Sequence, residues 1–501
     1  MENNTTVYLS ICDKAVSAEV GCDFSMPDYQ PEIRRLLRVR ATVLPPSSYV
    51  GAGKAEFSGA VRYDILYSGN DGQLYSASTS ENYQFSAPLD KDADVDQSDE
   101  TPVFCETVTE SVTGRVTAPR RLSLRCRVRG RIRVFGRHRL CERIFGQASD
   151  GVERLIGESQ CAVLTCRGAE SLELSDEVVP GGEIRVISSE AAVCVSEAVP
   201  CEGGVGCRGD AVLRLLLCRE GEGEMPFVTV RRIPFAVTVP VDGADGLSCR
   251  AQGQCTDLEA EVTDDGRVLC RLSVTVSAEG QGNVPVMYTS DLYATHRESS
   301  AVYTEYVFPV AARCISGNFT QSVYEPLSAF GLAEDCEVLD VCASAAVDDV
   351  SCDRGKWVLS GESRIHLLLR SGEEYATHEM SLPFRYETDG EGGEPMLCAA
   401  DVQMVSGRAR VDGGRLGIEC EMAISARICT EGRLTALSEA QIGEAEPVPS
   451  ETVVAFPARG ETVWSLAKRY RVPLATLSRL NTLPESPSAV LETGAPVVVN
   501  E

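Results

Sequence analysis

The chain has 501 residues, which is too long for one ordinary core, so we expect several domains. Hydrophobic residues make up 43% of it, which excludes general disorder, and a net charge of −27 argues against broad contact with nucleic acid or anionic lipid. The apolar runs are shorter than the ~20 residues that cross a bilayer. The first residues also lack the basic start and long apolar core of a secretion signal, so the sequence predicts a cytoplasmic protein without membrane insertion.

The first 150 residues have the pattern of strands. In Arg121–Phe135, apolar residues alternate with Ser or Arg, as in a strand with one buried face. Two shorter strand patterns flank Asn70–Gly72, which predicts a hairpin turn. The exception is a short helix that the spacing of apolar residues from Ile33 to Leu37 predicts. The acidic run Asp90–Glu100 predicts a solvated loop.

Four features of this first segment recur in the same order two more times. The glycines among them lie 150 and 152 residues apart. The recurring residues are Ala41, Ala191 and Ala343; Gly59, Gly209 and Gly361; Phe85, Phe235 and Phe384; and Arg121, Arg267 and Arg415. We therefore predict a mainly β fold with three repeated antiparallel, sandwich-like domains at residues 1–150, 151–300 and 301–440.

The remaining residues predict a linker and a small domain of a different class. Residues 441–452 are acidic and contain proline, as linkers often do. Residues 453–501 then read strand–helix–helix–strand, with Thr462 as the N-cap of the first helix. Pro473 stands where a second helix can begin, and APVVVN closes as a strand.

This C-terminal segment resembles a LysM domain over about Val453–Val499, on the residues GETVWSLAKRY, LN and the closing VVV. The resemblance implies a non-catalytic module that binds N-acetylglucosamine polymers, such as peptidoglycan or a chitin-like glycan, between two loops. By position, the loop residues are Arg459, Gly460, Glu461 and Thr462 on one side and Asn481, Thr482 and Leu483 on the other. Trp464 is either an anchor for a ligand or part of the small core.

The N-terminal part carries a second resemblance. DFSMPDYQPEIRRLLRVRATV followed by FSGAVRYDILYSGNDGQLYSAS resembles the SPOCS domain, also called DUF3794, and VLSGESRIHLLLRSGEEYATHEMSLPF fits a further copy. Repeated SPOCS units followed by a LysM domain resemble the SipL family of clostridial spore-envelope proteins. That resemblance implies a non-catalytic scaffold in the mother cell, at the forespore surface. There its LysM domain would bind a coat ATPase of the SpoIVA type.

Other chemistry has weaker support in the sequence. The 21 cysteines include no CxxC pair, and Cys126 and Cys270 alternate in phase with apolar residues, so we expect small buried side chains rather than disulfides or zinc ligands. No nucleophile elbow, HExxH or phosphate loop occurs, so we predict neither an enzyme nor a bound cofactor. Between Arg115 and Arg143, 11 arginines alternate with apolar residues, which indicates the outer face of a strand rather than a nucleic-acid site.

Two functions from different classes therefore remain open. The first is the spore-envelope scaffold that grips a partner protein. The second is a peptidoglycan-binding protein that its LysM domain anchors to the glycan.

Overall fold

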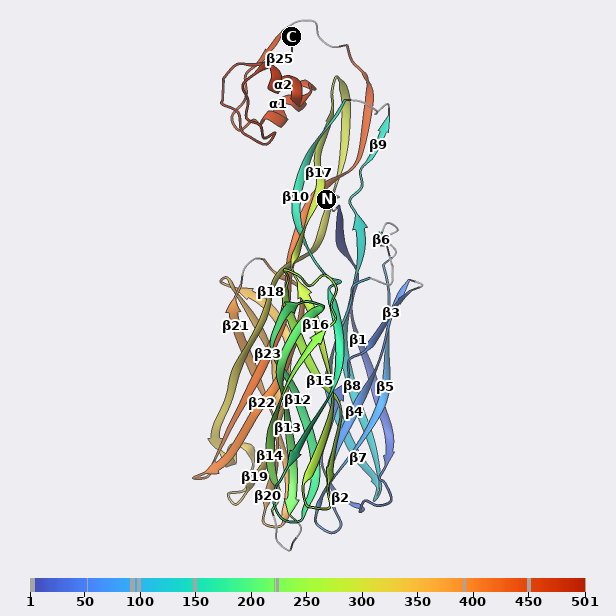
Figure 1. The fold of residues 1–501 in the computed structure, drawn as a ribbon, viewed down its shortest axis with the longest axis vertical. Coiled ribbons are helices and arrows are strands. Elements are labelled where there is room, and N and C mark those ends of the chain that lie inside the picture. The colour runs from blue at the N-terminus through green and yellow to red at the C-terminus, as the bar shows by residue number, and fades with distance from the viewer. Residues whose placement is uncertain are drawn as a thin grey trace.

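The computed structural model describes residues 5–51, 53–90, 95–96, 101–146, 151–219, 221, 225–390, 393–447 and 452–500. They form an elongated body of β-strands, a narrower neck above it and a small domain at the tip (Figure 1). The tip domain carries the helices α1 (Val463–Tyr470) and α2 (Leu474–Leu480). Among the described residues, no helix is long and apolar enough to cross a membrane. The prediction of a mainly β chain with a small helical end is confirmed.

The first unit of the body is a sandwich of two antiparallel sheets. In one sheet β8 lies between β1 and β7 and also pairs with β6; in the other, β4 lies between β2 and β5 and also pairs with β3. Alternation explains the layering, because Leu122, Leu124 and Val128 of β8 are fully buried while the arginines between them are exposed. The strands are β1 (Thr6–Ser25), β2 (Ile33–Val43), β3 (Ser47–Gly51), β4 (Lys54–Gly69), β5 (Leu74–Pro88), β6 (Val95–Asp96), β7 (Val103–Ala118) and β8 (Arg121–Arg139).

The second and third units repeat this topology. The central strands are β16 and β13 in the second unit, and β23 and β20 in the third. The second unit comprises β11 (Arg167–Val178), β12 (Ile184–Cys201), β13 (Gly204–Arg219), β14 (Phe227–Val239), β15 (Ser248–Val262) and β16 (Val268–Gln281). The third comprises β18 (Arg297–Pro326), β19 (Glu337–Asp353), β20 (Lys356–Ser371), β21 (Glu374–Asp389), β22 (Pro395–Asp412) and β23 (Arg415–Ala445), with the 3-10 helix η1 (Leu327–Phe330). The described strands thus contain the threefold repeat that the sequence predicts.

The recurring glycines mark one place in each unit where an aromatic residue lies on the neighbouring strand. The cross-strand partners are Tyr83 for Gly59, Phe235 for Gly209 and Phe384 for Gly361. The sequence spacing predicted that Phe85 is the equivalent of Phe235 and Phe384. The register shows instead that Phe85 lies opposite Phe57, and that Tyr83 takes the equivalent place. A Cβ on Gly209 would lie only 2.1 Å from the carbonyl oxygen of Cys194, so close backbone approach requires a glycine there.

The three units form a closed ring in which one kind of contact occurs three times. Strand β5 contacts β12, β14 contacts β19, and β21 contacts β2. An interface between different surfaces that closes after three steps gives pseudo-threefold symmetry. Equivalent apolar residues of all three units meet on the axis in one buried cluster: Leu37, Ile187 and Leu339, with Leu66, Leu216 and Leu368.

Two local predictions are wrong, and a third is only partly covered. The residues from Ile33 to Leu37 begin strand β2 rather than a helix; β-bulges after Ile33 and after Leu36 shift the side chains and mimic helical spacing. Strand β23 continues to Ala445, so the predicted linker starts later than residue 441. The predicted loop Asp90–Glu100 lies outside the described residues, except for Asp90 and β6.

The neck is built from the segments that join the units. Strand β10 (Val152–Ala162) pairs with β17 (Asn283–Ala294), and β9 (Arg143–Gly146) runs parallel to the end of β23. Strands β18 and β23 pair along almost their whole lengths and continue from the body into the neck (Figure 1). At about 3.4 Å per residue, the 30 residues of β18 span about 100 Å. The predicted boundary at residue 300 falls within strand β18, whereas residue 150 lies outside the described residues.

Candidate functional site

The C-terminal domain at the tip has the predicted strand–helix–helix–strand order. Strand β24 (Val453–Ala455) pairs with β25 (Val497–Asn500), and the two helices lie between them in sequence. Thr462 caps α1: its hydroxyl accepts a bond from the Ser465 backbone at 3.1 Å, and the Ser465 hydroxyl accepts one from the Thr462 backbone at 2.7 Å. Leu466, Ala467 and Leu477 are fully buried, so both helices contribute to one small core.

The first predicted binding loop is held by contacts of Glu461 with the preceding backbone and with helix α1. The Glu461 carboxylate accepts a hydrogen bond from the Ala458 backbone at 2.8 Å and pairs with Arg469 at 3.3 Å. Its side chain is largely buried, so Glu461 shapes the loop rather than reaching outward. Gly460 has a φ of 79°, a left-handed conformation that favours glycine. Arg459 and Gly460 are exposed.

The second predicted loop is tied to the first. Asn481 ends α2, and its side chain bonds the backbone of Leu477 and both the N–H and the carbonyl of Val498 in β25, at 2.7–3.0 Å. Asn481 therefore has a structural role, while Thr482 is exposed and Leu483 packs against the small core. The loop then turns back, and the carbonyls of Pro487 and Ala489 accept bonds from the first backbone N–H groups of α1, at 2.9 and 3.1 Å.

The outer surface of the C-terminal domain also carries apolar residues that the sequence reasoning missed. Phe456 is 62% exposed, Val490 is 61% exposed, and Val454 is also exposed. Phe456 comes three residues before the first loop, and Val490 forms a bridge with Thr462 of that loop. Exposure of this kind cannot be read from the sequence, because strand alternation fits either face of such a small sheet.

Residues 458–498 match the LysM domain family. LysM domains are generally peptidoglycan-binding modules. The comparison with curated proteins and the comparison with solved structures found no match. The chain thus has a C-terminal LysM domain that follows a large, mainly β region.

Trp464 of the LysM domain is neither a free anchor nor only a core residue. It is 4% exposed, and its ring packs edge-on against Tyr293 of the neck, with 4.9 Å between the ring centroids. Its indole N–H donates to Asp291 of β17 at 2.7 Å. Of the predicted site residues, Trp464 therefore lies on the side that faces the neck, whereas Arg459, Gly460 and Thr482 are open to solvent.

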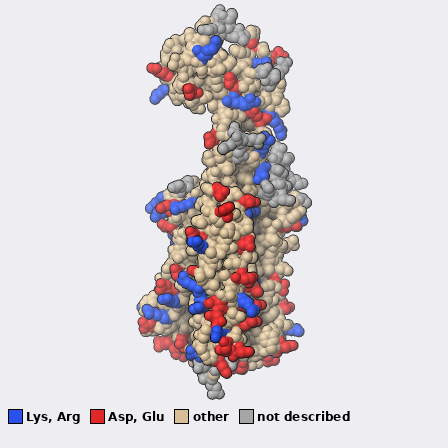
Figure 2. Space-filling view, in the orientation of Figure 1, with Lys and Arg blue, Asp and Glu red and all other residues tan. Residues whose placement is uncertain are grey.

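The arginines of strand β8 lie on its outer face and form ion pairs. Arg125, Arg127, Arg129 and Arg131 pair with Glu19, Glu110, Asp348 and Asp13, at 2.7–3.4 Å. Figure 2 shows acidic and basic side chains intermixed along the visible face of the body. A nucleic-acid site would need a continuous basic stripe, whereas the arginines of β8 are paired with acidic side chains.

The cysteines are free thiols, and among the described residues neither they nor the histidines belong to a metal-binding cluster. All 21 cysteines are free, and burial raises the pKa of many of them, for example to about 12 for Cys398. Among the described residues, no three His, Cys, Asp or Glu side chains lie where they could hold a metal ion. His366 and His378 lie on neighbouring strands, where His366 faces Glu379 at 3.6 Å. Burial lowers the pKa of His366.

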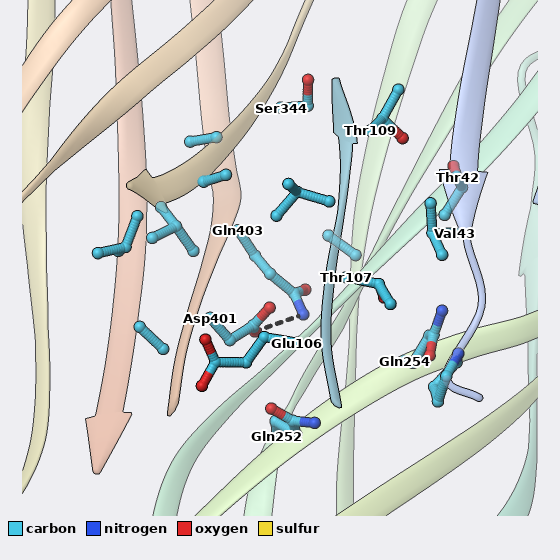
Figure 3. Close-up of a pocket in the computed structure, with 18 of the residues that line it drawn as sticks. Thr42, Val43, Glu106, Thr107, Thr109, Gln252, Gln254, Ser344, Asp401 and Gln403 are labelled. Atoms are coloured by element: carbon cyan, nitrogen blue, oxygen red, sulfur yellow. Dashed lines mark hydrogen bonds between the residues drawn. The ribbon is translucent and has the colours of Figure 1, made fainter. Parts of the chain in front are cut away.

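A central cavity of about 1650 Å³ lies inside the ring of three units. Equivalent strands line it: β2 and β7, β12 and β15, β19 and β22. Glu106, Gln252 and Asp401 project into it from the three units (Figure 3), and Gln403 donates to Asp401 at 2.9 Å. Burial raises the pKa of both Glu106 and Asp401, which favours their neutral forms.

Proposed function

We propose that this protein is a non-catalytic scaffold of the bacterial spore envelope that binds a partner protein through its LysM domain. The partner in this proposal is a coat ATPase of the SpoIVA type, and the place is the forespore surface in the mother-cell cytoplasm. The observation that carries the proposal is the position of the LysM domain. It sits at the far end of a long neck, away from a closed ring of three similar β units (Figure 1).

Three features support a binding role over a chemical one. The body repeats a single topology three times, and its contacts between units serve to close the ring. The LysM domain presents exposed apolar side chains, Phe456 and Val490, beside exposed polar loop residues. A mixture of this kind is typical of protein interfaces, whose centres are apolar and whose rims are polar.

Peptidoglycan binding is the second candidate, because the matched family generally binds that glycan. Both candidates use the same exposed loops, around Arg459 and Thr482. They differ in what must touch Phe456 and Val490. A protein partner buries such residues, whereas a glycan held between the two loops does not need Val490.

The test uses the full chain and two surface variants. Val490→Ser should weaken binding to the purified coat ATPase and leave retention on insoluble peptidoglycan unchanged, whereas Thr482→Arg should weaken both. The matched control is Val179→Ser, which alters another exposed valine (69%) in the body, far from the tip. Retention on peptidoglycan without any binding to the ATPase would reject the scaffold in favour of the glycan. Uniform cytoplasmic fluorescence of a tagged chain during sporulation would also contradict it.

A further inference from the structure

One side of the LysM domain, formed by α1 and the turn after it, contacts the neck. Asp291 lies near the end of β17 and receives three side-chain hydrogen bonds: from Trp464 at 2.7 Å, from Lys468 at 2.6 Å and from Tyr303 at 2.5 Å. Trp464 and Lys468 are four residues apart on α1, so they lie on one face of the helix. Asp291 thus gathers donors from the LysM domain and from the neighbouring strand β18.

We propose that Asp291 is a positioning residue that locks the LysM domain onto the neck, so that its outer loops face one fixed direction. A carboxylate suits this place because it only accepts hydrogen bonds, and all of its partners are donors. In an asparagine at this position, the amide NH₂ would face the N–H of Trp464 or the ammonium group of Lys468. Two donors would then face each other, and one hydrogen bond would be lost. Asparagine is therefore the sharpest replacement, since it changes the chemistry and keeps the size.

Further contacts surround Asp291 and show that the docked face is specific. The hydroxyl of Tyr293 donates to the carbonyl of Val472 at 2.8 Å, and the backbone N–H of His296 donates to the carbonyl of Arg471 at 2.8 Å. The backbone N–H of Leu474 donates to the carboxylate of Glu153 in β10 at 3.2 Å. The turn between the two helices of the LysM domain therefore fits between the ends of two neck strands.

The neck therefore contributes to binding by fixing the orientation of the LysM domain, whichever ligand the outer loops bind. A domain on a loose tether samples many directions, whereas a docked domain holds its ligand at a set distance from the three-unit body. A partner that meets the docked domain does not have to restrict its motion first, so less conformational entropy is lost on binding.

Asp291→Asn in the full chain tests the proposal without any ligand, so its outcome is independent of the proposed partner. The chain has two tryptophans, and Trp357 is fully buried in the body, so quenching by acrylamide reports on Trp464. We expect quenching to increase in the variant. We also expect amide hydrogen exchange in peptides that contain His296 and Leu474 to accelerate by at least ~10-fold, which corresponds to about 1.4 kcal/mol. The melting of the body should not change.

Lys468→Met, which alters the same contact from the LysM side, should shift both readouts in the same direction. Glu298→Gln is the matched control, because Glu298 pairs with Arg471 at 3.3 Å at the exposed rim of the interface and its loss should change neither readout. The proposal is overturned if Asp291→Asn and Lys468→Met both leave quenching and exchange at the wild-type level.

Discussion

Removing the charge of Glu190 tests whether buried ion pairs hold the three units of the ring together. Glu190 of β12 accepts hydrogen bonds from Arg38 at 2.9 Å and from Arg40 at 2.6 Å, both on β2 of the first unit. Arg38 also lies 3.7 Å from Asp340 of the third unit. Side-chain exposure is only 6% for Arg38 and 15% for Glu190, so solvent screens these charges weakly. One carboxylate thus joins two units, and Arg38 extends the cluster to the third.

The pKa shift of Glu190 and the usual cost of breaking a buried ion pair lead to the same expected loss of stability. Burial alone would raise the pKa of Glu190, but Arg40 and Arg38 outweigh it and lower the pKa from its ordinary 4.5 to about 2. A shift of this size corresponds to about 3 kcal/mol of favourable interaction at neutral pH. Removing one partner of a buried ion pair typically costs about 3–5 kcal/mol, because the remaining charge stays buried. We therefore expect Glu190→Gln to lower the free energy of unfolding by about 3 kcal/mol at pH 7.

Urea unfolding of the full chain at several pH values measures this loss. Because the pKa of Glu190 is lowered in the folded state, its stabilisation is complete above pH 4.5 and disappears as the pH falls toward 2. The difference between the wild type and the variant should therefore shrink to less than half at pH 3. The matched control is Glu19→Gln, whose ion pair with Arg125 is 69% exposed on both sides and should contribute at most about 1 kcal/mol. If Glu190→Gln is no more destabilising than this control at pH 7, the buried ion pairs do not hold the units together.

Three further predictions concern the LysM core, a repeated glycine and the thiols. Leu477→Asp should unfold the LysM domain while the body still melts normally, because the new charge would lie in a small core; an unchanged Trp464 emission would contradict this. Gly209→Ala should destabilise the chain by about 1–3 kcal/mol in urea unfolding, whereas the same change at Gly393, which has open space around it, should have no effect. Iodoacetamide at pH 8 should modify the exposed Cys141 first, as mass spectrometry can show; faster reaction of Cys398 would refute the inference from burial.

The repeat and the LysM domain could be predicted because each depends on a local pattern. Alternation over Arg121–Phe135 directly reflects which face of β8 is buried, and residues 458–498 match a family on short signatures. The beginning of β2 could not be predicted in this way. Its two bulges offset the side chains, and an offset strand has the same apolar spacing as a short helix.

The neck and the contact between Trp464 and Asp291 could not be predicted from local sequence patterns, for a different reason. Strands β9, β10 and β17 come from the joints between units, which have no equivalent inside a repeat. The partners Asp291 and Trp464 are separated by 173 residues, and no spacing rule connects them. The sequence placed Trp464 near a binding site, but only the fold shows that its partner belongs to the same chain.

The charges near the ring axis differ from one unit to the next. Arg40, Glu190 and Cys342 each stand directly before the recurring alanine, so they occupy equivalent places. Identical units would bring three like charges together at a buried point, where their repulsion would be severe. The middle unit instead supplies an acid to the arginines of the first. The same unit supplies Glu279, which pairs with Arg427 of the third unit at 2.9 Å. These ion pairs between units therefore depend on the units carrying different residues at these places.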